Sequence, residues 1–255
     1  MNSPKDPEAL IEENATSINQ AAFTVFKDLI LAVQPNDPDR QRIGNESLLA
    51  DIFGDKPVPI PRNLSIDPTV TDLLYRFLEL IQLPENFEAI EPMAKRHPWK
   101  GSISRAKHLA NCWFLMVHEA YILEERLKRF LNCVGACAEA RGLTFDKAIP
   151  KVVLRSHQEN FGDLVAARGV HVHQRATIPR EIERVALIDL LKGELPVFEL
   201  FGRDAIANAR KQLIARSVTS RISAKVLIAT AIDMTSPVWE IAVREELKKL
   251  PITQA

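Results

Sequence analysis

The chain has 255 residues, 46% of them hydrophobic, so it is long enough to bury a substantial core, and disorder is not expected. Lysine and arginine balance aspartate and glutamate at 33 each, which excludes a global electrostatic attraction to nucleic acid or to an anionic membrane. Any such contact must be local. Glycine is scarce, at 9 residues, and good helix formers fill the long stretches, so the composition predicts an all-α protein.

The sequence contains no segment that we expect to span a membrane. Its first residues are polar and acidic, without the basic-then-apolar order of a secretory signal. The most apolar stretch, Leu109 to Leu123, is interrupted by His118 and Glu119 and is shorter than the roughly 20 apolar residues that a span needs. We therefore expect a cytoplasmic protein with no membrane partner.

Prolines divide the first 100 residues into helices and an irregular connection. Apolar residues at helical spacing predict a helix over Glu8 to Val33, and five prolines then favour an irregular or extended segment from Gln34 to Asp67. Asp67 followed by Pro68 is a typical helix start and opens a helix over Thr69 to Leu83, which Pro84 closes. A short helix and turn are predicted over Glu85 to Pro98.

The longest predicted helix, Ser102 to Arg141, forms the spine of the expected bundle. Gly142 is its C-terminal stop. A short helix after Thr144, reaching Lys151, and a second over Ser156 to Arg168 follow it. Further helices are predicted over Arg180 to Lys192, from Arg203 to about Met234, and from Pro237 to about Leu250. The expected regions are an N-terminal one (1–100), a helical core (101–193) and a C-terminal one (194–255), packed as one domain.

The three cysteines, Cys112, Cys133 and Cys137, all fall in the predicted spine helix. An odd number of cysteines within one helix does not suit a disulfide framework. We interpret them as small buried hydrophobic residues in a reducing compartment. Serine or cysteine nucleophile motifs, phosphate-binding glycine loops and paired metal signatures are missing from the sequence.

The stretch from Arg203 to Lys225 is distinctly basic, with a single acid, Asp204. A helix there could contact RNA phosphates, although aromatic residues that would stack on bases are absent apart from Phe201. The alternative is a solvated helix that packs through its apolar side. The candidate RNA-binding residues are Arg210, Lys211, Arg216 and Arg221.

The segment FGDLVAARGVHVHQR, from Phe161 to Arg175, gathers an arginine and two histidines at a predicted helix end. Gly169 would stop the helix and leave Arg168 on its last turn. The next residues alternate, so His171 and His173 would project together from a short extended piece.

Arg168 and His173 fit the spacing of an arginine, four residues and a histidine, which resembles the motif of the HEPN superfamily of helical domains. The resemblance covers mainly Ser102 to Lys192, where LEERLKRFL lies in the long helix before the motif and IPREIERVALIDLL begins the helix after it. That family often places asparagine, aspartate or histidine directly after the arginine, whereas this chain has Gly169. His171 would supply the polar group from two residues further on.

The resemblance implies metal-independent cleavage of RNA, or RNA binding, by a homodimer with a composite site and without a cofactor. His173 would act as the acid or base, because imidazole titrates near neutral pH, and Arg168 would bind the phosphate. His171 completes the candidate catalytic set. An antitoxin-type protein partner is also implied.

Three other interpretations remain open. Arg168 could cap carbonyl groups at its own helix end, with both histidines held by partners in a turn. His171 and His173 could form a His-x-His metal pair, completed by His157, Asp163 or Glu159. The chain could also be a non-catalytic helical interaction protein that forms a homodimer.

Overall fold

The chain folds into long helices. A computed structural model describes residues 7–33, 67–96, 103–173, 178–191 and 197–249, and all regular elements within them are helical, which confirms the all-α prediction. The predicted connection from Gln34 lies outside the described residues up to Asp67. The described helices are α1 (Pro7–Val33), α3 (Pro68–Ile81), α4 (Leu83–Lys95), α5 (Arg105–Ala140), α6 (Ala148–His173), α7 (Arg180–Leu191) and α8 (Val197–Lys249).

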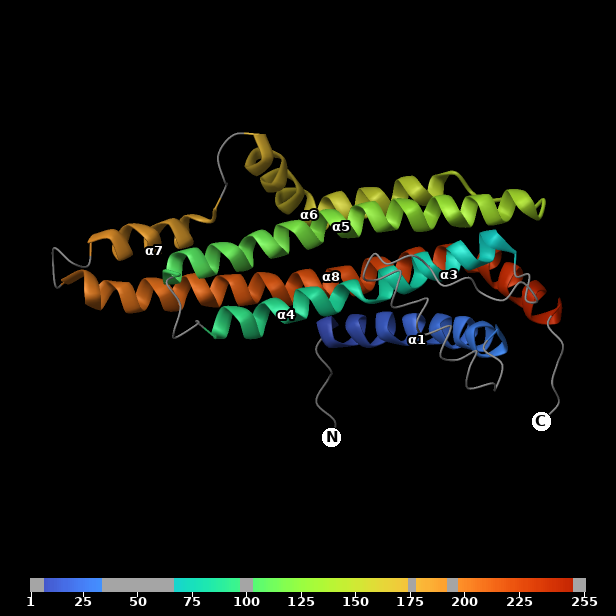
Figure 1. Ribbon diagram of the computed structural model, residues 1–255, viewed down its shortest axis with the longest axis horizontal. Helices are drawn as coiled ribbons and strands as arrows, with labels where there is room; N and C mark the ends of the chain where they lie inside the picture. The colour runs from blue at the N-terminus through green and yellow to red at the C-terminus, as the bar shows by residue number, and fades with distance from the viewer. Residues whose placement is uncertain (1–6, 34–66, 97–102, 174–177, 192–196, 250–255) are drawn as a thin grey trace, which may run out of the picture.

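The helices form an elongated bundle around α8, which extends along its whole length (Figure 1). α5 lies beside α8 in the same direction, since Ser220 meets Met116 and Glu245 meets Arg141 at the same sequence offset. α6 and α7 cover one side of this pair, and α3, α4 and α1 cover the other (Figure 1). α8 contacts every other described helix.

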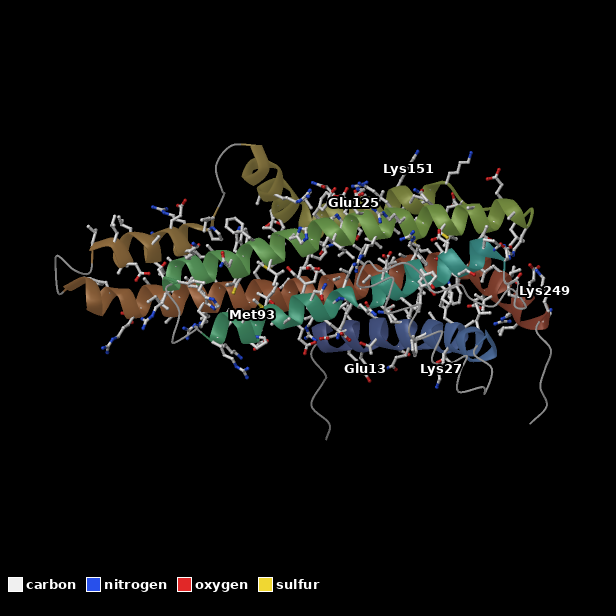
Figure 2. The ribbon with its side chains drawn as sticks, in the orientation of Figure 1. Glu13, Lys27, Met93, Glu125, Lys151 and Lys249 are labelled. Atoms are coloured by element: carbon white, nitrogen blue, oxygen red, sulfur yellow. The ribbon has the colours of Figure 1, made fainter. Side chains whose placement is uncertain are left out.

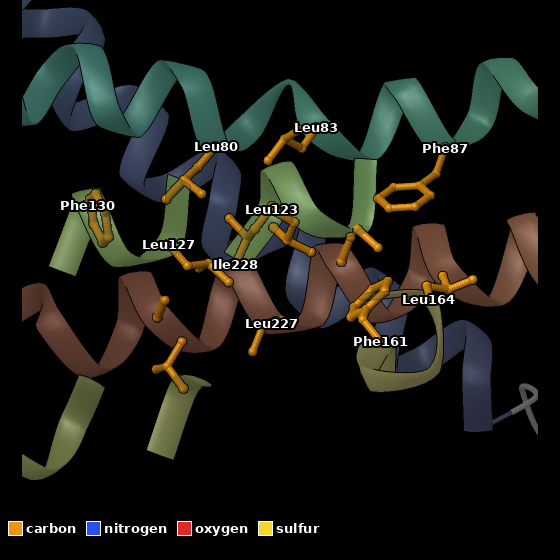
Figure 3. Close-up of a cluster of buried hydrophobic side chains, with 14 of the residues drawn as sticks. Leu80, Leu83, Phe87, Leu123, Leu127, Phe130, Phe161, Leu164, Leu227 and Ile228 are labelled. Atoms are coloured by element: carbon orange, nitrogen blue, oxygen red, sulfur yellow. The ribbon is translucent and has the colours of Figure 1, made fainter. Parts of the chain in front are cut away.

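The core lies between these layers and is almost entirely aliphatic and aromatic. Figure 3 shows side chains from α3, α4, α5, α6 and α8 meeting in its centre, among them Leu80, Phe87, Leu123, Phe161 and Ile228, all of which are fully buried. Burial of this kind stabilises by roughly 1.5–3 kcal/mol per large side chain. One apolar cluster therefore links helices from both ends of the sequence.

Two predicted helix boundaries are confirmed by the backbone. Asp67 caps α3, because its Oδ1 accepts a hydrogen bond of 2.8 Å from the backbone N–H of Thr69, and Pro68 occupies the first turn. Gly142 ends α5 with a φ of 62°, a left-handed conformation that favours glycine. Leu143 then donates its N–H to the carbonyl of Ala138.

Two of the predicted breaks between helices, one between Lys151 and Ser156 and one at Pro237, are wrong. The short helix before Lys151 and the helix from Ser156 are one continuous helix, α6, in which Val153 and His157 stay buried. The helices predicted on either side of Pro237 are also one helix, α8. Pro237 removes the N–H donor for the carbonyl of Asp233. In the preceding turn, the side chains of Thr235 and Trp239 add hydrogen bonds to the carbonyls of Ala231 and Ile232. Packing of α8 on its neighbours offsets the remaining cost.

α8 also contains the segment, Phe201–Lys249, that is long and apolar enough by composition to cross a membrane; it is the one such helix among the described residues. More than half of its most apolar window is buried within the protein. Since α8 packs against every other described helix, its apolar character is that of a core helix in a bundle.

Candidate functional site

Arg168 lies on α6 where this helix packs against α5. Leu164 and Phe161, one and two turns earlier, are fully buried and fix this part of α6. The guanidinium carbon of Arg168 lies 3.4 Å from the centroid of the Tyr121 ring on α5. This is a close cation–π contact, and it holds the guanidinium plane against the ring.

The predicted helix stop at Gly169 is wrong, and so is the extended segment after it. α6 continues through Gly169 to His173. Glycine inside a helix costs only about 0.5–1 kcal/mol relative to alanine, so it permits a stop without imposing one. The last turns of α6 lean away from α5 and project from the bundle (Figure 1). The side chains of His171 and His173 lie outside the described part of the structure.

The continuous helix changes which motif residues share a face. At about 100° per residue, the positions of Arg168 and His173 are roughly 140° apart around the axis of α6. Arg168 and His171, three residues apart, are separated by only about 60°. His171, rather than His173, is therefore the same-chain neighbour of Arg168.

The residues that could complete a metal site with the histidines are engaged elsewhere. His157 is buried, stacks on Phe161 and hydrogen-bonds through Nε2 to the carbonyl of Ala120 at 3.0 Å. Burial lowers the pKa of His157 below its ordinary value of 6.5, against the effect of this hydrogen bond. Asp163 pairs with Arg216 and Glu159 with Arg155. Within the described ranges, no group of three metal-ligating side chains exists.

The four candidate RNA-binding residues of α8 fall into two classes. Arg216 contacts Asp163 at 2.6 Å and Arg221 contacts Glu12 at 3.0 Å, so these two tie α8 to α6 and α1. Lys211 is exposed, and Arg210 is partly buried. The Nε of Arg210 is buried and has no hydrogen-bond partner among the described residues.

The most extensive polar cluster involves Arg141, which the sequence did not single out. Its side chain is 8% exposed and forms ion pairs with Asp67 at 2.9 Å, Glu245 at 3.0 Å and Glu246 at 3.6 Å. Burial opposes the charge of Asp67, but hydrogen bonds from Thr69 and the positive charge of Arg141 outweigh it and lower the pKa of this carboxyl group. The cluster joins the start of α3 to the ends of α5 and α8. No sequence motif marks it, because its members lie far apart in the chain.

Two cysteines lie beside this cluster. Cys133 and Cys137 are buried, as predicted, and both sulfur atoms lie near the carbonyl oxygen of Thr69, at 3.7 and 3.4 Å. A hydrogen bond between the two thiols lowers the pKa of Cys137 to about 7, against the effect of burial, and raises that of Cys133. Cys112 is also buried, and burial raises the pKa of its thiol.

Two hollows on the described surface are shallow, and glutamates form part of the lining of each. One is lined by α1 residues that include Glu12 and Glu13, and the other by α4 residues that include Glu85, Glu88 and Glu91. Neither encloses a motif residue.

Compared with known proteins, the chain matches no family model, no curated protein and no solved structure. The residues of the chain itself are thus the basis on which its function can be argued.

Proposed function

We propose that the chain cleaves or binds RNA at the projecting end of α6, in a site completed by a second copy of the chain. The observation that carries this proposal is the position of Arg168. A guanidinium group that stacks through its face on Tyr121 keeps N–H donors at its edges, in a plane held by the ring. Such a fork can bind two oxygens of one phosphate group.

The second copy follows from the geometry of α6. One helix places Arg168 and His171 near one face and His173 on the other side, so a single copy lacks a full set of acid, base and cation on one surface. Two copies related by a two-fold axis would bring two such helix ends together. HEPN-like domains, which the motif resembles, use a composite site of this kind.

The residue types suit cleavage without a metal. A neutral histidine would accept the proton of a ribose 2′-hydroxyl, whose oxygen forms a bond to the adjacent phosphorus. The bond from phosphorus to the 5′-oxygen breaks as a protonated histidine donates its proton to that oxygen. The products are a 2′,3′-cyclic phosphate and a 5′-hydroxyl. Arg168 would stabilise the additional negative charge in the transition state.

The test is cleavage of a panel of end-labelled single-stranded and structured RNAs in the presence of EDTA. We expect wild-type protein to cleave, and Arg168→Ala and His173→Ala to lose about 10²- to 10⁴-fold in rate with unchanged helical content. Tyr121→Phe should retain activity because it keeps the ring. Tyr121→Leu should lose activity because the guanidinium then has no platform.

Mixing the two inactive variants tests the shared site. If Arg168 of one copy acts with His173 of the other, co-refolded Arg168→Ala and His173→Ala should recover about a quarter of wild-type activity, from one intact site in half of the dimers. Cleavage by the double variant at the wild-type rate would refute the assignment.

A second candidate function, that of a non-catalytic interaction protein, is favoured by exposed apolar residues at one end of the bundle. Leu187, Leu190 and Phe201 are 57%, 76% and 56% exposed. Exposed large apolar residues that lie close together mark surfaces that bind other proteins. A chain that forms dimers but neither cleaves nor binds any RNA of the panel would have this function instead.

A further inference from the structure

The C-terminus of α4 and the N-terminus of α5 meet beside the first part of α8, toward one end of the bundle (Figure 1). The C-terminus of α4 contacts the N-terminus of α5 through a hydrogen bond of 2.8 Å between His108 Nε2 and the Met93 carbonyl. Because α5 and α8 run in the same direction at a fixed offset, Arg105 and Lys107 lie level with Ala209 and Lys211. Residues from three separate parts of the sequence therefore surround one end of the molecule.

Cations gather at this end. Nitrogen-tipped side chains project from it around Met93 (Figure 2). Six of the described cationic side chains lie there, five of them exposed and one, that of Arg210, partly buried. We call this set the basic end: Arg96 at the C-cap of α4, Arg105 and Lys107 of α5, and Arg203, Arg210 and Lys211 of α8.

Within the described part of the chain, the cations of the basic end lack the carboxylate partners that most other cations of α8 have. Arg216, Arg221 and Lys225 each form an ion pair with a carboxylate. Among the described residues, no carboxylate forms an ion pair with a member of the basic end. Three acids lie nearby: Glu91 pairs with Lys95, Asp204 is exposed, and Asp189 of α7 accepts a hydrogen bond of 3.5 Å from the backbone N–H of Ala106. α7, on the other side, has two bases and three acids and adds no positive charge.

We propose that the basic end binds the phosphate backbone of RNA. This step rests on the proposed function and extends it, since Arg168 alone would hold a single phosphate. Arg203 and Arg210 are seven residues apart on α8, so they lie within about 20° of one face and about 10 Å apart along it. Arginine at such positions binds phosphate oxygens through a planar set of donors.

The composition of the basic end favours backbone contact over base recognition. Among the side chains that the structure describes, Phe201 is the exposed aromatic residue nearest to it in sequence, and four arginines and two lysines supply the charge. Contacts of this kind are insensitive to sequence and strongly sensitive to salt. Arg105 and Lys107 precede Tyr121 by four turns of α5, about 21–24 Å, so one RNA of modest length can reach both the basic end and Arg168.

The test is RNA binding by fluorescence anisotropy at several salt concentrations, with a labelled RNA hairpin as the probe. The variant is the triple substitution Lys107→Gln, Arg203→Gln and Lys211→Gln, which changes exposed residues only. Its matched control is Lys147→Gln, Lys151→Gln and Lys248→Gln, three exposed lysines at the opposite end of the bundle, where Figure 2 labels Lys151. Circular dichroism checks that both variants remain helical.

We expect the slope of log K against log salt to fall in magnitude by about 2–3 in the basic-end variant and to stay unchanged in the control. An equal loss in both variants, or no loss in the first, would overturn the proposal. Binding to phosphatidylserine vesicles without binding to the hairpin would overturn it as well, and would assign the basic end to an anionic lipid surface.

The Arg168→Ala variant separates this inference from the proposed function. If that variant stops cleaving and its salt slope falls by only about one, the contribution of a single phosphate contact, both proposals stand. If wild-type protein never cleaves RNA but the basic-end variant loses its slope, RNA binding at the basic end stands while cleavage fails. If wild-type protein cleaves RNA but the basic-end variant keeps the wild-type salt slope, the proposal for the basic end fails and the proposed cleavage stands.

Discussion

At the scale of single residues, Arg141 shows how one side chain can join three helix ends. It is nearly buried, and its carboxylate partners come from the start of α3 and the end of α8. Glu246 is 2% exposed and depends on Arg141 and Lys249 for its counter-charge. Removing one member of such a cluster leaves buried charge without compensation, which costs more than the cluster contributes when it is intact.

We therefore expect Arg141→Ala to lower the free energy of unfolding by about 3 kcal/mol, measured by urea denaturation at pH 7. Arg141→Lys keeps the charge and should lose less. Lys151→Ala, at an exposed position, is the control and should change stability by less than about 0.5 kcal/mol. An Arg141→Ala variant as stable as this control would show that the cluster does not hold the helix ends together.

The same cluster predicts part of the acid sensitivity of the protein. The folded state lowers the pKa of Asp67 below its ordinary value of 3.8, so its contribution to stability is fully present above that pH. The contribution is lost as pH falls through the lower, folded-state pKa. Arg141→Ala should weaken this dependence, because a cause of the lowered pKa is then gone.

His157 should give a separate dependence at higher pH. Burial lowers its folded-state pKa, so the unfolded chain takes up a proton first, and stability falls as pH drops from about 6.5. One proton corresponds to a slope of at most about 1.4 kcal/mol per pH unit. His157→Gln should reduce the slope between pH 7 and pH 5, measured by urea unfolding. His118→Gln, at an exposed position, should leave it unchanged.

At the scale of helices, the ends were easier to predict than the interruptions. Asp67 and Gly142 were identified from sequence because a cap acts through its own side chain or φ angle. Gly169 and Pro237 were misjudged, since whether a helix continues through such a residue depends on packing that only the fold provides. Arg168 was predicted as a site residue, but its platform, Tyr121, lies 47 positions earlier and had no signal in the sequence.

α1 offers a test of tertiary support for a helix. Phe26 is fully buried and stacks on Phe77 of α3 and Trp239 of α8, with ring centroids 4.3 and 5.2 Å apart. We expect Phe26→Ala to cost about 3–5 kcal/mol and to make α1 sensitive to protease. Phe23→Ala, at a position that is 40% exposed, should stay near wild type by urea unfolding and limited proteolysis. Equal protease resistance of both variants would contradict the anchoring role of Phe26.

At the scale of the whole molecule, the net charge does not reveal how the charges are distributed over the surface. The chain is neutral overall, and the basic stretch from Arg203 to Lys225 is evident in the sequence without the charges that surround it in the fold. The fold neutralises Arg216 and Arg221 and places Arg96, Arg105 and Lys107 beside Arg203, Arg210 and Lys211. A neutral molecule thus acquires a cationic end, because positions distant in the chain meet there.

The central place of α8 also has a consequence for the order in which the protein is made. A ribosome completes the preceding helices before it synthesises α8, which packs against each of them. Until then α5 can pack against α3, α4, α6 and α7, but the apolar faces that these helices and α1 turn toward α8 have no partner, so the bundle stays incomplete. The final core therefore forms only after α8 has been made.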